Sequence, residues 1–241
     1  MMKTWAITDV GLVRKENQDA YRIARGGDVC VVCDGMGGAA GGQIASTLAA
    51  ETYAAELEKI LKPDMNPEQL REASSYAVAM ANLAVENRAS EDDELSNMGT
   101  TLVSAIAYEG GAVVTNVGDS RAYYITRAGI TRITKDHSLV ESMVDHGDIT
   151  AEARPHPSRN LITRALGRDT NASCDGYIRP MEKGDYLLLC TDGLVNTVTD
   201  QEMLFEVLHG QDEDSCLHRL MEIAKSQGAP DNVTAVLMRM L

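Results

Sequence analysis

Short apolar segments of strand length alternate along this chain with pairs of longer amphipathic segments, and this order constrains the fold more than any other feature. The segments with strand character are residues 4–9, 20–33, 103–107, 112–117, 122–126, 130–134, 174–178, 186–190 and 233–239. The helical segments come in two pairs, at 44–61 with 67–88 and at 201–208 with 214–227. Because helices cover the faces of sheets, this order predicts an α+β fold, a four-layer sandwich of two antiparallel sheets flanked by helix pairs.

Local signals refine several of these elements. The run Val29–Cys33 is continuously apolar, which is typical of a central strand covered on both faces. Pro63 ends the first helix, and Pro67 lies near the first turn of the second. The four strands between residues 103 and 134 are separated by Gly110-Gly111, Gly118-Asp119 and Ala128-Gly129, a spacing that predicts an antiparallel meander.

Residues 135–172 break the pattern. They combine short helical pieces and polar turns with three histidines and two prolines, His137, His146, Pro155, His156 and Pro157. This composition predicts an inserted segment that lies on the surface. The chain shows no internal repeat and no linker, so we expect residues 1–241 to form a single domain.

The charge balance limits the partners of the protein. The chain of 241 residues has a formal net charge of -14 and a sequence pI near 4.7. A nucleic-acid backbone would be repelled, so nucleic acid is not expected as a partner. An anionic substrate is still allowed, because bound divalent ions would reverse the sign of the local field.

The cysteines and the apolar runs bear on the cellular compartment. The 5 cysteines have no regular spacing, which argues against a disulfide framework and favours a reducing cytoplasm. No signal peptide is evident at the N-terminus, and no stretch approaches the ~20 apolar residues of a membrane helix. We therefore expect a soluble cytoplasmic protein that makes no membrane contact.

Four aspartates stand beside residues that free or bend the backbone. Asp34, Asp119 and Asp192 each follow an apolar run, and Asp231 comes just before one. This pattern places carboxylates at the ends of buried strands, where they repel one another and need a counter-charge. Hard cations such as Mg²⁺ or Mn²⁺ are the usual one.

A two-metal site needs one carboxylate to bridge the ions and others to hold each ion singly. Asp34 is the best candidate for the bridge, and Gly35 has no Cβ to keep a metal from its carbonyl oxygen. Asp192 and Asp231 would complete the shell of the other ion. Arg14 carries a planar guanidinium that can bind two phosphoryl oxygens at once. Taken singly, an Asp-Gly pair is more often an ordinary turn and Arg14 a surface residue.

Seven short motifs occur together and in a fixed order. They are Arg14-Lys15-Glu16-Asn17-Gln18-Asp19, Asp34-Gly35-Met36-Gly37-Gly38, Gly99-Thr100-Thr101, Gly118-Asp119-Ser120-Arg121, Lys135-Asp136-His137, Thr191-Asp192-Gly193 and Asp231-Asn232-Val233-Thr234. With these motifs the chain resembles the metal-dependent Ser/Thr protein phosphatases of the type 2C (PPM) family, in their compact bacterial form. The resemblance covers nearly the whole chain.

The resemblance implies a role for each candidate residue at a binuclear Mn²⁺/Mg²⁺ centre. Asp34 matches the bridging ligand, Gly35 the carbonyl ligand of the first metal, and Asp192 and Asp231 the ligands of the second. Asp19 matches a carboxylate that acts through metal-bound water. Asp119 matches a position that holds, with Asp192, a weaker third ion. Arg14 matches the phosphate-binding arginine.

The resemblance also implies a reaction and partners. A metal-activated water attacks phosphorus in line and releases phosphate from phosphoserine or phosphothreonine of protein substrates. A cognate Ser/Thr kinase is the expected opposing enzyme, and a monomer the expected state. Residues 135–172 match a flap beside the active site that influences substrate choice.

The chain departs from the family pattern at three points. No residue matches the histidine proposed in some relatives as the general acid, which leaves metal-bound water and His137 as candidates. Asn196 stands where some relatives have another aspartate, so the third ion is the least secure of the three. Pro230 replaces an arginine that precedes the last aspartate in some relatives.

Two other functions fit the sequence less well. A binding module that docks phosphoproteins without hydrolysis would be marked by loss of a metal aspartate, and all four are present. A nucleotide-binding enzyme could use the Gly-rich loop at 35–42, but that loop lacks the Gly-Lys-Ser/Thr ending of a P-loop. Cys33 and Cys190 precede two of the aspartates but lie in apolar runs, which favours a place in the core over nucleophilic catalysis.

Overall fold

Two antiparallel sheets form the centre of the protein. The computed structural model describes residues 2–38, 41–147, 161–168 and 173–241. One sheet has the order β1 (Met2–Asp9), β11 (Val233–Met240), β10 (Tyr186–Cys190), β7 (Arg121–Thr126) and β8 (Gly129–Arg132). The other has the order β2 (Asp19–Ala24), β3 (Val29–Met36), β5 (Leu102–Tyr108), β6 (Gly111–Val117) and β9 (Asp175–Pro180), with β4 (Gly99–Thr100) paired to the end of β3.

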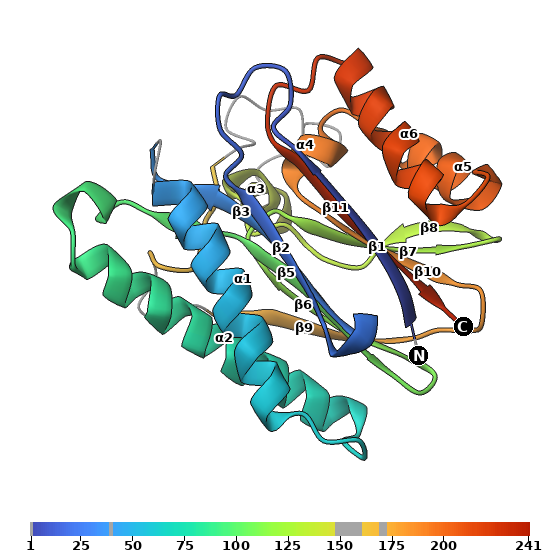
Figure 1. Cartoon of the computed structure of the whole chain (residues 1–241), viewed down its shortest axis with the longest axis horizontal. Helices are drawn as coiled ribbons and strands as arrows, with labels where there is room; N and C mark the ends of the chain where they lie inside the picture. The colour runs from blue at the N-terminus through green and yellow to red at the C-terminus, as the bar shows by residue number, and fades with distance from the viewer. Residues whose placement is uncertain (1, 39–40, 148–160, 169–172) are drawn as a thin grey trace.

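Helices cover the outer face of each sheet (Figure 1). The long helices α1 (Gly41–Ile60) and α2 (Pro67–Ser90) lie on the β2-β3-β5-β6-β9 sheet, and α5 (Asp200–His209) and α6 (Glu213–Ser226) lie on the other. The shorter elements are the 3-10 helices η1 (Arg25–Gly27) and η2 (Asp93–Leu95) and the helices α3 (Leu139–His146) and α4 (Asp192–Val195).

Three separate hydrophobic layers confirm the predicted four-layer sandwich. One lies between the α1/α2 pair and its sheet, one between the α5/α6 pair and its sheet, and the third between the two sheets. The middle layer is built from small and branched side chains of both sheets, among them Val32, Val103, Val114, Leu187 and Val236. Each fully buried side chain of this size contributes roughly 1.5–3 kcal/mol to folding.

The run in β3 is buried on both faces, as its composition predicted. Val29, Val31 and Cys33 contribute to the layer under the helices, whereas Cys30 and Val32 contribute to the layer between the sheets. This alternation follows from the period of two in a strand. It leaves no solvated face, which explains why the segment reads as continuously apolar.

Two predictions about the strands were wrong. Residues 20–33 form two strands, β2 and β3, because the chain turns through η1, where Gly26 and Gly27 have φ of 67° and 102°. The meander is also incorrect, since β6 pairs with β5 and β9 while β7 pairs with β10 and β8. The link between β6 and β7 crosses from one sheet to the other at Gly118. A crossing with a glycine turn looks the same in sequence as a hairpin.

The helix predictions were largely confirmed. The first helix starts at Gly41, three residues before the first apolar residue of its stripe. The second begins at Pro67, with a capping box between Asn66 and Gln69. No helix in the described ranges is long and apolar enough to cross a membrane. All five cysteines are free thiols, as expected.

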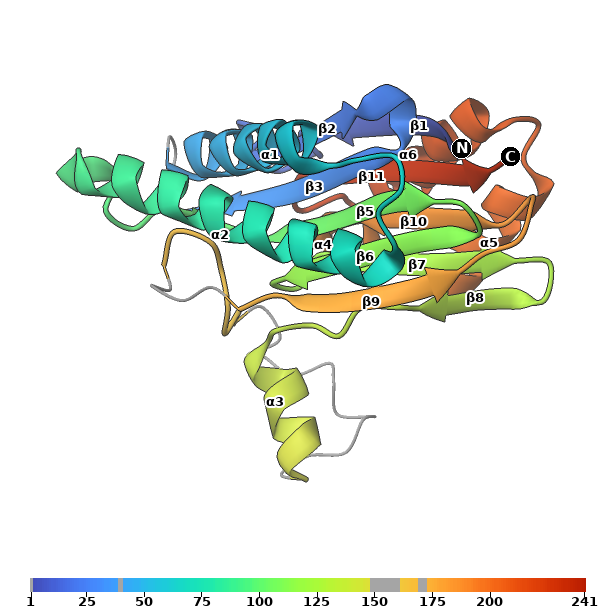
Figure 2. The same cartoon turned by 90° about the horizontal axis from the view of Figure 1, so that it is seen from below.

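The predicted insertion is described in part. Its helix α3 projects beyond the sheet edges formed by β8 and β9 (Figure 2). Residues 161–168 return to the body of the protein through the bridges Ser138↔Ile162 and Thr100↔Leu166. Residues 148–160 and 169–172 of the predicted flap lie outside the described residues.

Candidate metal centre

The four aspartates predicted to bind metal meet at one end of the sandwich. This end lies opposite the chain termini, because Met2 pairs with Met240 while Asp9 pairs with Val233. The aspartates line a cavity of about 530 Å³. Its described lining consists of Arg14, Lys15, Glu16, Gln18, Asp34, Gly35, Met36, Gly37, Gly38, Asp119, Ile162, Asp192, Asp231 and Asn232.

Both sheets supply carboxylates to this cavity. Asp34 lies near the end of β3, Asp119 follows β6, Asp192 is the first residue of α4 directly after β10, and Asp231 precedes β11. Each position is the boundary of a rigid strand, as the sequence predicted. The site therefore spans the junction of the two sheets.

The backbone of Asp34 is held by Thr101. The Asp34 N–H donates to Thr101 Oγ1 at 2.9 Å, and the Thr101 N–H donates to the Asp34 carbonyl at 2.9 Å. Thr101 Oγ1 also lies 2.7 Å from Ser120 Oγ, next to Asp119. Since Thr101 and Ser120 are fully buried, this hydroxyl pair ties two of the aspartates to one rigid point.

Gly35 lies where no side chain fits. A Cβ on this residue would come within 2.0 Å of the Gly42 carbonyl oxygen and 2.6 Å of the Gln18 carbonyl oxygen. The absence of a side chain lets the start of α1 approach the end of β3. Gly35 is also part of the cavity lining, so its backbone borders the space that an ion would occupy.

Replacing Gly35 with alanine is expected to lower the free energy of unfolding by about 2–3 kcal/mol, because the clash is with backbone atoms that cannot move aside. The matched control is Gly38→Ala, where an added Cβ meets nothing within 4 Å and only the φ of +87° opposes the change. Its expected cost is about 1 kcal/mol. Urea denaturation of both variants measures the difference, and equal losses would contradict the steric argument.

Two of the site's carboxylates each have a buried oxygen without a partner. Asn196 Nδ2 donates to Asp192 Oδ2 at 3.1 Å, while Thr191 Oγ1 donates to Asp19 Oδ2 at 2.9 Å. The second oxygens, Asp192 Oδ1 and Asp19 Oδ1, are buried and have no hydrogen-bond partner among the described residues. A buried carboxylate oxygen without a donor is costly unless a cation or water approaches it.

Burial and mutual repulsion raise the pKa values of this cluster. Burial, followed by the charges of Asp19 and Asp192, raises the pKa of Asp34 well above its usual range. Burial raises the pKa of Asp19 to about 7, with Asp192 and Asp231 adding to the effect. Burial and the charge of Asp192 raise the pKa of Asp119 to about 7. A cation that offset these charges would favour the ionised form of the carboxylates at neutral pH.

The donor set suits a hard, hydrated cation. No three His, Cys, Asp or Glu side chains in the described ranges converge as a ready-made metal cage. Mg²⁺ commonly keeps several waters and binds through one or two carboxylates, and carboxylate, carbonyl and water oxygens suit Mn²⁺ as well. The four carboxylates, the Gly35 carbonyl and the open cavity fit ions held in this way.

With a chelator present, the free energy of unfolding is expected to fall as the pH rises from about 4 to about 7. Asp19 and Asp119 have a pKa of about 7 in the folded chain against 3.8 for an unperturbed aspartate. In this window the folded protein keeps protons that the unfolded chain has released, so each rise in pH favours unfolding. Asp9 and Asp175 have lowered pKa values and are ionised in both states above about 4.

Urea denaturation at several pH values across this window measures the slope. Asp119→Asn should make the slope shallower, because it removes one of the carboxylates whose pKa is raised in the folded chain. Saturating Mn²⁺ should flatten it, because the ion offsets the carboxylate charges. A metal-free stability that rises over the same window would contradict the prediction.

Arg14 lies at the rim of the cavity. Its NH2 group donates to Asp231 Oδ2 at 2.7 Å, and its side chain is 54% exposed. The guanidinium is therefore within reach of both a carboxylate of the site and a ligand from solvent.

The prediction overlooked Asn232, which fixes the loop that carries Arg14. Its amide nitrogen donates to the carbonyls of Val10 and Glu16, each at 2.9 Å, and its Oδ1 accepts from the Gln18 N–H at 2.8 Å. The side chain is 5% exposed. The available signal in the sequence was its position directly after Asp231. An asparagine beside a site residue can fix a turn, because its side chain both donates and accepts hydrogen bonds.

Two predicted residues lie behind the cavity. Asp19 is 9% exposed and bonds to Thr191, so it lies behind the cavity-lining carboxylates. His137 is 7% exposed and is not part of the described lining, which argues against its candidacy as general acid. Cys33 and Cys190 are buried core residues, as predicted, and burial raises the pKa of the Cys190 thiol to about 12.

Comparison with known proteins agrees with this geometry. A family model described as "Protein phosphatase 2C" matches residues 13–238. The serine/threonine protein phosphatase PstP of Mycobacterium tuberculosis (strain H37Rv) is 38% identical over 235 residues, which are 96% of this chain and 44% of that protein. The chain thus spans less than half the length of PstP.

Solved structures match over nearly the whole chain. The serine/threonine phosphatase Stp1 from Staphylococcus aureus has a TM-score of 0.93 and 34% identity, over 100% of this chain and 96% of that one. The catalytic domain of PstP in complex with two manganese ions has a TM-score of 0.83 and 33% identity, over 99% and 97% of the two chains.

Proposed function

Because the chain belongs to the protein phosphatase 2C family, we propose that it is a metal-dependent protein-serine/threonine phosphatase whose described fold is a single catalytic domain. The observation that carries the proposal is the cavity itself. Four aspartates beside strand ends face it, and Arg14 stands at its rim. The PstP catalytic domain was crystallised with two manganese ions, which supports Mn²⁺ or Mg²⁺ as the cofactor.

Each site residue has a role in this proposal. Asp34 would be the ligand shared by two ions, Gly35 would offer its carbonyl oxygen to the first, and Asp192 and Asp231 would hold the second. Asp19 lies behind these residues and would act through water. Asp119 faces the same cavity as Asp192, and the pair would hold a third, weakly bound ion. When bound, the ions supply an acidified water as nucleophile and neutralise the phosphoryl oxygens.

The protein's own residues do the positioning. Arg14 presents parallel N–H groups that match two phosphoryl oxygens and orient phosphorus for in-line attack. Thr101 and Asn232 hold Asp34 and the Arg14 loop from behind, so the site is in place before substrate binds. The leaving serine or threonine oxygen takes its proton from water in the open cavity.

The proposed substrates are phosphorylated Ser/Thr proteins in the cytoplasm. The relatives with sequence or structural similarity are bacterial enzymes named as Ser/Thr phosphatases, which supports a bacterial signalling role opposite a Ser/Thr kinase. A monomer is proposed. Neither nucleic acid nor a membrane has a place in this proposal, since the net charge of -14 would repel both phosphate backbones and anionic lipids.

Phosphate release from phosphoserine and phosphothreonine peptides tests the proposal. Release should require Mn²⁺ or Mg²⁺ and stop when the ion is chelated. If no phosphate is released, calorimetric titration with the same phosphopeptide measures whether the protein binds it. Binding with no release at saturating metal would support the alternative of a docking module, and neither binding nor release would reject both.

A further inference from the structure

His137 forms two hydrogen bonds with the backbone of Gly118, the residue before Asp119. The Gly118 N–H donates to His137 Nδ1 at 3.1 Å, and the His137 N–H donates to the Gly118 carbonyl at 2.9 Å. Gly118 has a φ of +102°, and a Cβ there would come within 2.6 Å of Thr101 Cγ2. One histidine thus satisfies both polar groups of a glycine in a conformation that few other residues adopt.

The hydrogen bond to Gly118 fixes the tautomer of the imidazole. Because Nδ1 accepts a hydrogen bond from the Gly118 N–H, the neutral ring carries its own hydrogen on Nε2, which lies 3.2 Å from Asp175 Oδ2. Arg164 binds the other oxygen of Asp175 at 3.2 Å. Burial, together with the charge of Arg164, lowers the pKa of His137. Both ring nitrogens are hydrogen-bonded to protein groups, Nδ1 to Gly118 and Nε2 to Asp175. Neither nitrogen is therefore available to donate a proton to a leaving group in the cavity.

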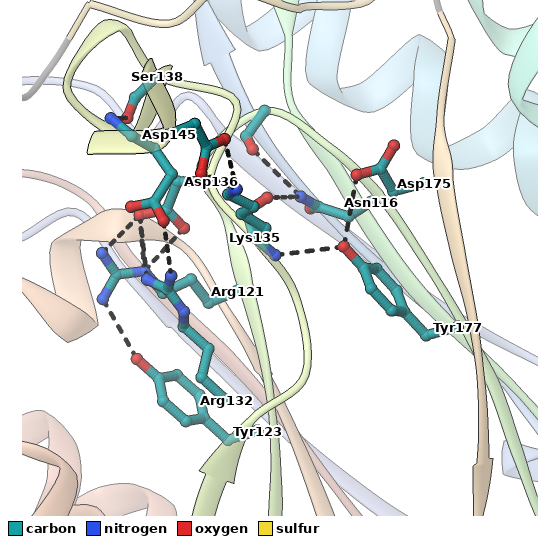
Figure 3. Close-up of polar contacts among 12 residues, drawn as sticks. Asn116, Arg121, Tyr123, Arg132, Lys135, Asp136, Ser138, Asp145, Asp175 and Tyr177 are labelled. Atoms are coloured by element: carbon teal, nitrogen blue, oxygen red, sulfur yellow. Dashed lines mark hydrogen bonds and ion pairs between the residues drawn. The ribbon is translucent and has the colours of Figure 1, made fainter. Parts of the chain in front are cut away.

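The neighbours of His137 are themselves anchored (Figure 3). Asp136 receives two N–H groups of Arg121, at 3.0 Å and 2.7 Å, and the Lys135 carbonyl accepts from Asn116 Nδ2 at 3.1 Å. Asn116 Nδ2 also donates to the Gly118 carbonyl at 3.2 Å. The strand end that carries Gly118 and the segment that carries His137 are therefore locked together from both sides.

His137 is also bonded to the segment that carries Ile162, another residue of the cavity lining. The Thr163 N–H donates to its carbonyl oxygen at 2.8 Å, and the next residue, Ser138, forms a bridge with Ile162. Ile162 is part of the cavity lining. The same residue therefore contacts the peptide before Asp119 and the segment that brings Ile162 to the site.

We propose that His137 is a positioning residue of the phosphatase site, which fixes the Gly118–Asp119 turn through Nδ1 and is not the general acid. The neutral ring accepts the Gly118 N–H at Nδ1, and Asp175 accepts the hydrogen that this tautomer carries on Nε2. The kinetic part of this inference rests on the proposed phosphatase function. The structural part, the bond between Gly118 N–H and Nδ1, does not.

Three variants separate the two roles. His137→Phe keeps a ring but removes both side-chain bonds. In His137→Asn, the amide Oδ1 takes the place of Nδ1 and can accept from Gly118, while no atom replaces Nε2. His137→Gln offers an amide near the place of Nε2 but leaves the Gly118 N–H without an acceptor, and it substitutes for His137→Phe if that variant does not fold.

Amide hydrogen exchange of Gly118, measured by NMR without metal and compared with the Val31 amide of β3, tests the bond directly. His137→Phe or His137→Gln should exchange about tenfold faster at Gly118, as the loss of one net hydrogen bond predicts. His137→Asn should remain within about threefold of the wild type. Unchanged exchange in His137→Phe would overturn the proposal.

Steady-state kinetics with Mn²⁺ tests the role. p-Nitrophenyl phosphate has a leaving group that needs no acid, whereas a phosphoserine peptide has one that does. A positioning residue predicts that His137→Phe lowers kcat/KM about tenfold for both substrates and that His137→Asn restores most of it. A loss confined to the phosphopeptide, shared by His137→Asn, would assign the acid role instead. An inactive wild type would reject the phosphatase function, and the exchange data would still decide the bond.

Discussion

Replacing Asp34 with asparagine is expected to lower kcat at least about 10³-fold while making the metal-free protein more stable. The loss follows from removal of the proposed bridge between two ions, whose combined effect on the transition state is worth several kcal/mol. The gain follows from the cluster, since burial and the charges of Asp19, Asp192, Asp119 and Asp231 all disfavour ionised Asp34. Removing that charge relieves the repulsion.

Phosphopeptide turnover and thermal unfolding with a chelator measure the two effects in one variant. About 1 kcal/mol of stabilisation corresponds to a rise in Tm of about 2–4 °C for a chain of this size. Below about pH 4 the difference in Tm should shrink, because Asp34 is then protonated in both states. Asp28→Asn is the matched control, since Asp28 accepts from the Met2 N–H remote from the cavity. A variant that loses activity and stability together would indicate a structural role for Asp34.

Replacing Arg14 with alanine is expected to lower kcat/KM for a phosphopeptide about 10²-fold, which is typical of removing one charged donor from a developing oxyanion. Arg14→Lys should recover little of this loss, because an ammonium cannot bind two phosphoryl oxygens in a fixed plane. Inhibition by inorganic phosphate should weaken in parallel.

Arg22→Ala is the control for Arg14, since Arg22 pairs with Glu51 outside the cavity. Exposed pairs of this kind contribute little to stability, so its kinetics should match the wild type within about twofold. Full activity in Arg14→Lys would mean that only the charge of Arg14 matters. Full activity in Arg14→Ala would remove the residue from the site altogether.

The sequence carried enough information to locate the carboxylates. Strand ends are marked by apolar runs that stop at glycine or aspartate, and this local signal placed Asp34, Asp119, Asp192 and Asp231 correctly. That they share one cavity followed from their need for a common cation. Arg14 needed the family resemblance, because nothing in its local spacing distinguishes it from a surface arginine.

What the sequence did not predict depends on contacts between distant segments. The glycine turn after β6 has the composition of a hairpin, and only the pairing of β7 with β10 shows that it crosses between sheets. The role of Asn232 depends on three partners more than 200 residues away in the chain. His137 was considered for its chemistry alone, whereas its burial and its bonds to Gly118 and Asp175 decide what it can do.

The crossing at Gly118 has a consequence for how the two halves of the protein respond to an ion. Asp34 belongs to one sheet, while Asp192 and Asp231 adjoin strands of the other. An ion shared between them would link the two sheets. The distances between its ligands would depend on the offset of one sheet relative to the other. The apolar side chains of the middle layer set that offset. Their shapes would therefore influence metal affinity without contacting the ion.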